Sequence, residues 1–503
     1  MKLSQLLSPG PAKRDMVLLG GTRPETALKT GPNWNDETAE TLPPSGIRVS
    51  NMRRIDSAPT RDILVKLLHN DALGRNGDLA EFAGILKSIE GEFSLFVDAD
   101  WGSGKTFFVR QVACILEEVN PFLESHGDLD GLLDNNCELA PYTELNSFLP
   151  VYYNAWENDH WDDPLPSIAA SIALQGDACA SFRSDTEAGE KIAGTLDAIL
   201  GVFGHGGASS LRDAFSGRDL IQAYRDRETL RSSVSNLVDV ALPEKANTLL
   251  LIVDELDRCR PSFAMKVLEQ LKNLFTDDRV VIVYSVNPNQ LSHVVEGMYG
   301  QGFDGRRYLS RFYDLTIPLR KVDSYKQLEA NGFIKTFNRF DEIAYELTEA
   351  YGMTMRDANR YLTELFRVRP LVLENRDGFG DDWVRAFADA GLVPIMLALK
   401  VFDADAFASV VQKFEIEPLY HAFSKSEAAM EFMDATWGSY IKFEEGKTPS
   451  DEDRVGARHE LLEDLVYMIW CKDGNNSKYQ HSYQVLIGIS WEFGSFPRLA
   501  KII

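Results

Sequence analysis

The sequence predicts an α/β fold, with a parallel β-sheet covered by helices on both faces. Short apolar runs alternate with helix-length segments along residues 60–320, a pattern typical of parallel sheets. A glycine-rich turn follows the first of these runs, and a helix-like segment follows the turn. Hydrophobic residues make up 44% of the 503 positions and charged residues 25%, which is ordinary for a globular protein.

Five apolar runs are the predicted strands, at residues 93–98, 150–156, 249–253, 280–286 and about 313–318. Apolar side chains recur at helical spacing between them, which predicts helices within 62–89, over 105–119 and 262–275, and from residue 289. Residues 165–245 are a helix-prone insertion between the second and third strands, and residues 320–503 are mostly helical in pattern.

This pattern divides the chain into four parts. Residues 1–59 are rich in Pro, Gly, Thr and Asn and predict an extended or partner-ordered arm. The α/β core covers 60–320, including the helical insertion. We expect a helical lid over 321–370 and a C-terminal helical domain over 371–503.

Charge and composition exclude several classes of protein. A formal net charge of −24 argues against direct binding of nucleic acid, which requires concentrated basic residues. The acidic excess of residues 341–470 fits either solvated helix faces or a basic partner, and both alternatives stay open. The five cysteines are scattered, as expected for reduced thiols. No apolar run reaches the roughly 20 residues that a membrane span needs, and the N-terminus resembles no signal peptide, so we expect a cytoplasmic protein.

The strongest chemical signal is the run ADWGSGKT at residues 99–106. Its glycines permit a tight loop whose N–H groups point at phosphates, Lys105 reaches the β- and γ-phosphates, and the Thr106 hydroxyl binds Mg²⁺. The helix that follows adds its positive N-terminal end. The expected nucleotide-binding residues are Trp101, Gly102, Ser103, Gly104, Lys105, Thr106 and Phe107.

A second signal is the run LLLIVDELDR at residues 249–258. Taken alone, an ordinary buried strand explains it equally well. Together with the upstream loop it predicts that Asp254 holds Mg²⁺ and that Glu255 orients and deprotonates the attacking water. The sequence therefore favours Mg²⁺-dependent hydrolysis of ATP or a related nucleoside triphosphate over binding alone.

Three stretches make the resemblance specific: DWGSGKT at 100–106, YYNAWEND at 152–159 and DELDRCRP at 254–261. Two weaker ones are YLSRFYDLTIPL at 308–319 and MRDANRYL at 355–362. On these motifs the chain resembles the KAP family of P-loop NTPases over roughly residues 60–365. The resemblance implies a P-loop NTPase fold of the additional-strand type, with sheet order 5-1-4-3-2.

Two residues depart from the family pattern. Ala99 replaces the usual glycine of the loop, and Glu255 stands where many relatives have aspartate. Members of the family often carry membrane helices in the insertion. Here the apolar stretch at 194–204 is too short and too interrupted to span a bilayer, so the chain resembles a soluble, bacterial-type member.

The resemblance implies catalytic roles for three further residues. Asn287 is the expected polar sensor of the γ-phosphate or the attacking water, although a turn residue explains it equally well. Arg311 is a candidate finger toward a neighbouring subunit, and Arg356 is a candidate lid arginine. For both arginines the alternative is a surface or salt-bridged residue.

Two functions fit these features. The first is NTP hydrolysis coupled to a conformational change or to assembly of a larger complex. The second is a nucleotide-gated oligomeric scaffold with little turnover. By resemblance we expect a homo-oligomer, partner proteins encoded in the same operon and a setting in bacterial phage defence.

Overall fold

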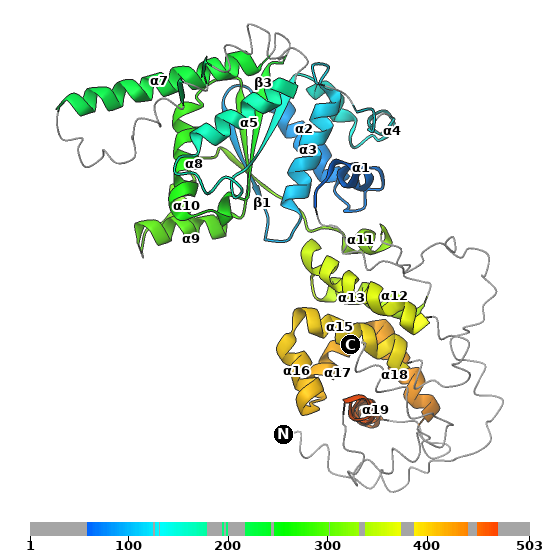
Figure 1. Ribbon diagram of the computed structural model, residues 1–503. Coiled ribbons are helices and arrows are strands. Elements are labelled where there is room, and N and C mark those ends of the chain that lie inside the picture. Colours follow the sequence, from blue (N-terminus) through cyan, green and yellow to red (C-terminus); the bar gives the residue numbers. More distant parts are fainter. Residues whose placement is uncertain are drawn as a thin grey trace. The chain divides into compact units, whose positions relative to one another are not determined.

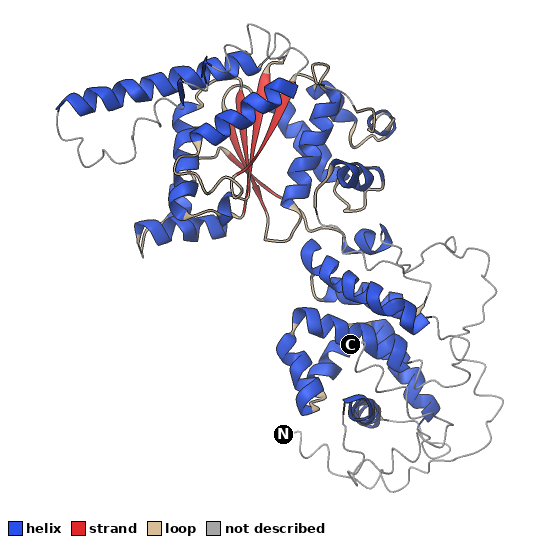
Figure 2. Ribbon diagram, viewed as in Figure 1, coloured by secondary structure: helices blue, strands red, loops and turns tan. Residues whose placement is uncertain are grey.

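The computed structural model describes residues 58–123, 126–129, 131–178, 194–195, 198–199, 217–242, 246–300, 302–330, 338–373, 387–440 and 450–470 (Figures 1 and 2). All but the last two positions of the predicted N-terminal arm, and most of the 194–204 stretch, lie outside these residues. Contacts divide the chain into two units, one covering Ala58–Lys326 and one starting at Gln327. The finer predicted division, with a separate lid and C-terminal domain, stays a prediction.

The first unit is built on a parallel sheet, drawn in red in Figure 2. Its five strands lie in the order β2-β3-β4-β1-β5, which confirms the predicted order. The strands are β1 (Phe93–Asp98), β2 (Phe148–Asn154), β3 (Thr248–Asp254), β4 (Val280–Val286) and β5 (Leu315–Pro318). Asp98 of β1 pairs with Val286 of β4, and Asp254 of β3 pairs with its neighbour Ser285. The carboxyl ends of β1 and β3 therefore lie at the same edge of the sheet, with β4 between them.

The observed strand limits match the prediction for β1 and β4, whereas the prediction for β2 was shifted. Residues 150–156 were expected, and the strand covers Phe148–Asn154. The Asn154 side chain accepts hydrogen bonds from the backbone N–H groups of Trp156 and Glu157, at 3.1 and 3.2 Å. Such an Asx turn ends the strand before the tryptophan.

Helices cover both faces of the sheet (Figure 1). One face packs against α1 (Arg61–His69), α2 (Asn76–Ser88), α3 (Lys105–Val119) and the 3₁₀-helix η5 (Ala140–Leu145), with α4 (Leu132–Asn135) beside them. The other packs against α5 (Leu165–Ala178), α7 (Gly217–Ala241), α8 (Pro261–Leu274), α9 (Pro288–Tyr299) and α10 (Gly305–Leu309). A short 3₁₀-helix, η6 (Leu256–Arg258), follows β3.

Alternating side chains of each strand supply the two cores. On β1, Leu95 and Val97 join the α2–α3 core, whereas Phe96 joins the core beneath α8 and α9. Phe82 of α2 and Phe108 of α3 meet edge-on, with ring centroids 5.5 Å apart. Strands buried on both faces are near-continuous apolar runs, and this explains why β1, β3 and β4 were readable from the sequence.

The second unit is helical, as its sequence pattern predicts. After α11 (Ser324–Ala330), which begins in the first unit, it contains α12 (Arg339–Ala350), α13 (Met355–Leu373), the π-helix η8 (Ala388–Leu392), α15 (Val393–Phe402), α16 (Ala404–Lys413), α17 (Glu417–Phe423), α18 (Glu427–Tyr440) and α19 (Asp451–Trp470). They share one core, in which the Tyr361 hydroxyl donates to the Pro394 carbonyl at 2.9 Å. Within the described ranges, no helix combines the length and the apolar character that crossing a bilayer requires.

Candidate functional site

The loop between β1 and α3 has the backbone that an anion site needs. Gly102 and Gly104 have φ angles of 82° and 89°, in the region that favours glycine. Gly104 is the N-cap of α3 and has no side chain, so the first N–H groups of the helix carry no side-chain cap. These groups and the helix dipole favour a phosphate at this point. Ala99 is not among the described residues with positive φ, which explains how alanine fits where relatives have glycine.

Lys105, the first residue of α3, folds over this loop. Its Nζ donates to the Ala99 carbonyl at 2.5 Å and to the Asp100 carbonyl at 3.3 Å. Only 9% of the residue is exposed. Burial lowers the pKa of Lys105, and the carboxylates of Asp257 and Asp254 oppose that shift. The ammonium thus lies among loop oxygens and carboxylates, where a phosphate would compete for it. Thr106 and Phe107 follow on the first turn of α3, with Thr106 half-buried.

Asp254 ends β3 and is held by two donors. The Tyr152 hydroxyl donates to its Oδ2 at 2.9 Å, and the Glu255 backbone N–H donates to its Oδ1 at 2.9 Å. The residue is 1% exposed. The Arg110 guanidinium covers the Tyr152 ring, 4.1 Å from the ring centroid. These contacts fix the orientation of the carboxylate.

The available oxygens suit Mg²⁺. The Asp254 carboxylate and the Thr106 hydroxyl are hard donors, and each Asp254 oxygen, with one hydrogen bond, keeps lone-pair capacity for a metal or its waters. No group of three or more His, Cys, Asp or Glu side chains in the described part of the chain could hold a metal by itself. This agrees with how Mg²⁺ binds beside nucleotides, through one or two protein groups, water and phosphate oxygens.

Glu255 has a strained backbone next to Asp254. Its φ of 59° is one of three positive values among described non-glycine residues, a conformation that costs about 1–3 kcal/mol. Its carboxylate pairs with Arg258 at 2.9 Å, and Arg258 also lies over the Trp156 ring. Burial raises the pKa of the Glu255 carboxyl, although Arg258 opposes the shift. Strain of this kind is concentrated at functional sites.

Asp257, which the sequence did not single out, links three loops of this edge. It is 5% exposed. Its Oδ2 accepts from the Trp101 indole N–H at 2.8 Å and from the Asn287 backbone N–H at 2.9 Å. One carboxylate thereby connects three segments: the loop at residues 99–104 (the phosphate loop), the turn after β3 and the start of α9. The only signal in the sequence was a second acid three positions after Asp254.

Asn287 lies beside the phosphate loop and also caps a helix. Its Oδ1 accepts from the backbone N–H groups of Asn289 and Gln290 at the start of α9. Its Nδ2 donates to the Asp100 carboxylate at 3.2 Å. The side-chain oxygen of Asn287 therefore acts as the turn interpretation expects, while its side-chain nitrogen points toward the phosphate loop. The sensor role stays a prediction.

The two candidate arginines lie in different units. Arg311 follows α10 in the first unit, is exposed and sits 5.4 Å from the centroid of the Tyr308 ring. Arg356 is the second residue of α13 in the second unit and is also exposed. These positions do not test the finger role of Arg311 or the lid role of Arg356, and both roles stay predictions.

The comparison with protein families now decides the family. Residues 77–370, more than half of the chain, match the KAP family P-loop domain. The chain belongs to the KAP family of P-loop NTPases. No curated protein matches it by sequence.

The KAP-type motif after β2 takes a defined structure in this protein. Asn154 makes the turn described above, and its carbonyl accepts from the Asn158 side chain at 2.9 Å. The Ala155 N–H donates to the Asp254 carbonyl at 3.0 Å, which joins the motif to the acidic strand. Trp156 and Trp161 are 54% and 46% exposed. The motif is thus bonded to Asp254 and exposes Trp156, and Trp161 just beyond it is exposed as well.

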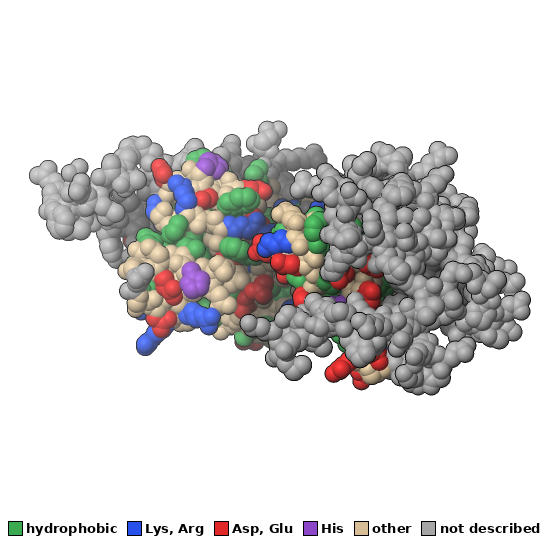
Figure 3. Space-filling model, turned by 90° about the horizontal axis from the view of Figure 1, so that it is seen from below, with side chains coloured by type: hydrophobic (Ala, Val, Ile, Leu, Met, Phe, Trp, Pro, Cys, Tyr) green, Lys and Arg blue, Asp and Glu red, His purple; other side chains and the backbone are tan. Residues whose placement is uncertain are grey.

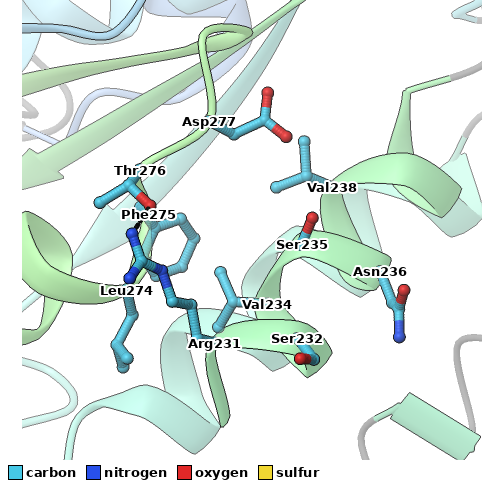
Figure 4. Close-up of a pocket in the computed structure, with 10 residues that line it drawn as sticks. All are labelled: Arg231, Ser232, Val234, Ser235, Asn236, Val238, Leu274, Phe275, Thr276 and Asp277. Atoms are coloured by element: carbon cyan, nitrogen blue, oxygen red, sulfur yellow. Dashed lines mark hydrogen bonds between the residues drawn. The ribbon is translucent and has the colours of Figure 1, made fainter. Parts of the chain in front are cut away.

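A separate cavity of about 350 Å³ lies between α7 and residues 274–277, and it is not part of the nucleotide site of this KAP protein (Figure 4). Arg231 of α7 donates to the Thr276 hydroxyl at 2.8 Å across it. Residues 274–277 precede β4, so the cavity lies at the amino end of that strand. The phosphate loop lies at the opposite, carboxyl edge.

Asp254→Asn should weaken Mg²⁺-dependent nucleotide binding more than Mg²⁺-independent binding. The amide keeps the shape of the carboxylate but removes the charge that favours a divalent cation. Affinity for ATP is measured by calorimetry with Mg²⁺ and with EDTA. The matched variant Tyr152→Phe removes the 2.9 Å donor to Asp254 but keeps the carboxylate, and should lose less. Equal losses with and without the metal in Asp254→Asn would count against a metal role.

Proposed function

We propose that this KAP protein hydrolyses ATP or a related nucleoside triphosphate in a Mg²⁺-dependent reaction. The supporting observation is the sheet register, which sets the phosphate loop after β1 and the acids that end β3 at one edge, with β4 between them. That arrangement offers a phosphate cradle and a carboxylate base at the same place. The decisive measurement is steady-state ATP hydrolysis by the full chain, with and without Mg²⁺.

Each site residue has a part in the proposed reaction. The N–H groups of the loop and the Lys105 ammonium hold the β- and γ-phosphates and offset the charge that develops there. Glu255 orients a water and accepts its proton as the water oxygen bonds to the γ-phosphorus and the bond to the β-phosphate oxygen breaks. Asp254 and Thr106 hold Mg²⁺, which neutralises phosphate charge when it is bound.

Hydrolysis is proposed to drive a conformational change or the assembly of a larger complex in the cytoplasm. A homo-oligomer and proteins encoded in the same operon are the proposed partners, and bacterial phage defence is the proposed setting. On the face shown in Figure 3, basic and acidic side chains of the described residues are interspersed. The formal net charge of −24 favours protein partners over nucleic acid. Loss of phage resistance in cells carrying Lys105→Ala, but not wild type, is the corresponding cellular test.

The alternative is a nucleotide-gated scaffold with little turnover. The observation that favours it is the 2.9 Å ion pair of Glu255 with Arg258, which keeps the proposed base engaged. A scaffold would bind ATP and change its oligomeric state without multiple turnovers. Sedimentation with ATP, compared with product release per subunit over the same period, separates the two functions.

Arg311→Ala should lower hydrolysis strongly while leaving ATP affinity nearly unchanged. An arginine finger supplied by a neighbour is worth about 10³–10⁵ in rate, and Arg311 is exposed after α10. If Arg311 is such a finger, specific activity of the wild type rises with protein concentration as subunits meet. Arg307→Ala, which removes another exposed arginine of the same segment, is the matched control.

The competing role for Arg311 is a local one, through its contact with the Tyr308 ring. In that case Arg311→Ala lowers only the melting temperature, or changes nothing, and activity per subunit stays constant on dilution. An active Arg311→Ala protein with a concentration-independent rate would exclude the finger.

A further inference from the structure

Arg75, at the N-terminal end of α2, is a fully buried arginine that contacts the phosphate loop from outside. It is 1% exposed. Its Nη2 donates to the Ser103 carbonyl of the loop and to the Arg320 carbonyl beyond β5, both at 2.8 Å. One guanidinium nitrogen therefore joins the loop, 28 residues after Arg75, to a segment that lies 245 residues after Arg75.

The second of these segments is residues 319–326, here termed the exit segment, which leads from β5 toward the second unit. Its start is tied to the loop strand, since the Leu319 N–H donates to the Asp98 carbonyl at 2.8 Å. The Asp323 N–H donates to the Leu73 carbonyl at 3.1 Å, and Lys326 pairs with Asp71. The turn between α1 and α2 is thus bonded along the exit segment.

Gly74 shows how close this packing is. Its φ is +65°, and a Cβ added there would lie 2.8 Å from the Asp323 Cβ, closer than real contacts allow. Only glycine fits at this point without moving the exit segment. By contrast, a Cβ added at Gly84 of α2 meets nothing within 4 Å.

The buried charge of Arg75 is incompletely satisfied. Its closest carboxylate contact is 3.9 Å, from Nη1 to Asp78 Oδ2. Arg75 Nε and Nη1, Asp78 Oδ2 and Ser103 Oγ have no hydrogen-bond partner among the described residues. Burial lowers the pKa of Arg75 to about 10, opposed by Asp78. The two short hydrogen bonds that Arg75 does make both come from Nη2, the atom that joins the loop to the exit segment.

We propose that Arg75 is a positioning residue that holds the phosphate loop and couples nucleotide occupancy of the loop to the exit segment. Arg75 plays this part only if the loop binds nucleotide, as proposed above. The loop and the exit segment share one guanidinium, so a shift of the Ser103 carbonyl on phosphate binding changes the bond to the Arg320 carbonyl. The state of the nucleotide site then reaches the residues that lead into the helical unit.

The test is amide hydrogen exchange of the full chain with and without saturating ATP and Mg²⁺. In the wild type, exchange in the exit segment should slow about 5-fold or more on binding, the low end of typical coupling. Arg75→Met should bind ATP about 10-fold more weakly, and at saturation its exit segment should no longer respond. Arg75→Lys keeps the charge without the planar fork and should be intermediate.

Two glycine variants separate coupling from folding. Gly74→Ala keeps the Arg75 side chain and places a Cβ against Asp323 of the exit segment, so ATP affinity should stay near that of the wild type while the exit-segment response falls. Gly84→Ala should match the wild type in both measurements. Because Arg75→Lys keeps the charge and a long side chain, it decides the question even where Arg75→Met does not fold.

The outcomes distinguish this coupling from hydrolysis itself. A normal exit-segment response in Arg75→Met or Gly74→Ala at saturating ATP would overturn the coupling, as would a wild type that binds ATP without any such response. ATP binding without hydrolysis would contradict only the proposed reaction. A wild type that binds no nucleotide by calorimetry would overturn both.

Discussion

Lys105→Ala should abolish measurable ATP binding. The variant loses the Lys105 ammonium, the cation that lies over the phosphate loop. Lys105 is 9% exposed, and its Nζ lies 2.5 Å from the Ala99 carbonyl oxygen. A hydrogen bond to a charged group contributes about 1.5–3 kcal/mol, and at the upper end this corresponds to about 100-fold in affinity. Titration calorimetry with ATP and Mg²⁺, at the concentrations that suffice for the wild type, should therefore show no heat of binding.

The control for this variant must remove a lysine without touching the loop. Lys87 on α2 is suitable, because its ammonium pairs with the exposed Glu144 on the surface, and Lys87→Ala should bind ATP as the wild type does. Thermal unfolding of Lys105→Ala shows whether the loop still folds. A folded Lys105→Ala protein with wild-type affinity would refute the assignment of the site.

The parts of the fold that were read correctly from the sequence are those set by local pattern. The limits of β1 and α3 match because an apolar run, a glycine turn and a helix follow one another within 27 residues of chain, Phe93–Val119. The strand order was available only through the family resemblance, since spacing along the chain does not say which strands pair. The carboxyl end of β2 was misjudged because Ala155 and Trp156 are apolar like the strand before them, and the turn made by Asn154 between them and Tyr153 was overlooked.

The residues of the candidate site also fall into two groups: those that stand in a local motif and those whose contacts only the structure shows. Lys105 and Asp254 stand in short motifs whose chemistry is legible residue by residue. Asp257 and Arg75 act through contacts with segments far away in the chain, such as the Arg75 bond to the Arg320 carbonyl. Nothing in their own neighbourhood predicts such a partner. Residues that position a site are therefore harder to find from one sequence than residues that touch the ligand.

Asn287 contacts both helix α9 and the phosphate loop, so the turn interpretation and a place beside the loop are compatible. Its carbonyl oxygen caps α9, as the NPN turn predicts, and its amide nitrogen reaches the Asp100 carboxylate at 3.2 Å. The cap fixes the side chain so that its amide faces the loop. One residue thus serves the helix with one atom and the phosphate loop with another.

Glu255→Gln should keep ATP binding and stop hydrolysis. The amide has the shape of the carboxylate but cannot accept a proton from water, and a positioned base is typically worth about 10²–10⁴ in rate. ATP affinity by calorimetry should remain near that of the wild type, because Glu255 is not expected to touch the phosphates. Steady-state phosphate release gives the rate.

The ion pair with Arg258 supplies the comparison that makes this result decisive. If Glu255 serves only to hold Arg258, at 2.9 Å, then Arg258→Ala removes that ion pair together with the Arg258 contact to the Trp156 ring, and should lower the rate at least as much as Glu255→Gln. If Glu255 is the base, Arg258→Ala leaves the carboxylate in place, and hydrolysis should fall much less than in Glu255→Gln. The positive φ of Glu255 supports the second outcome, because strained backbone of this kind is concentrated at functional sites. A Glu255→Gln rate within a few-fold of the wild type would mean that another group takes the proton.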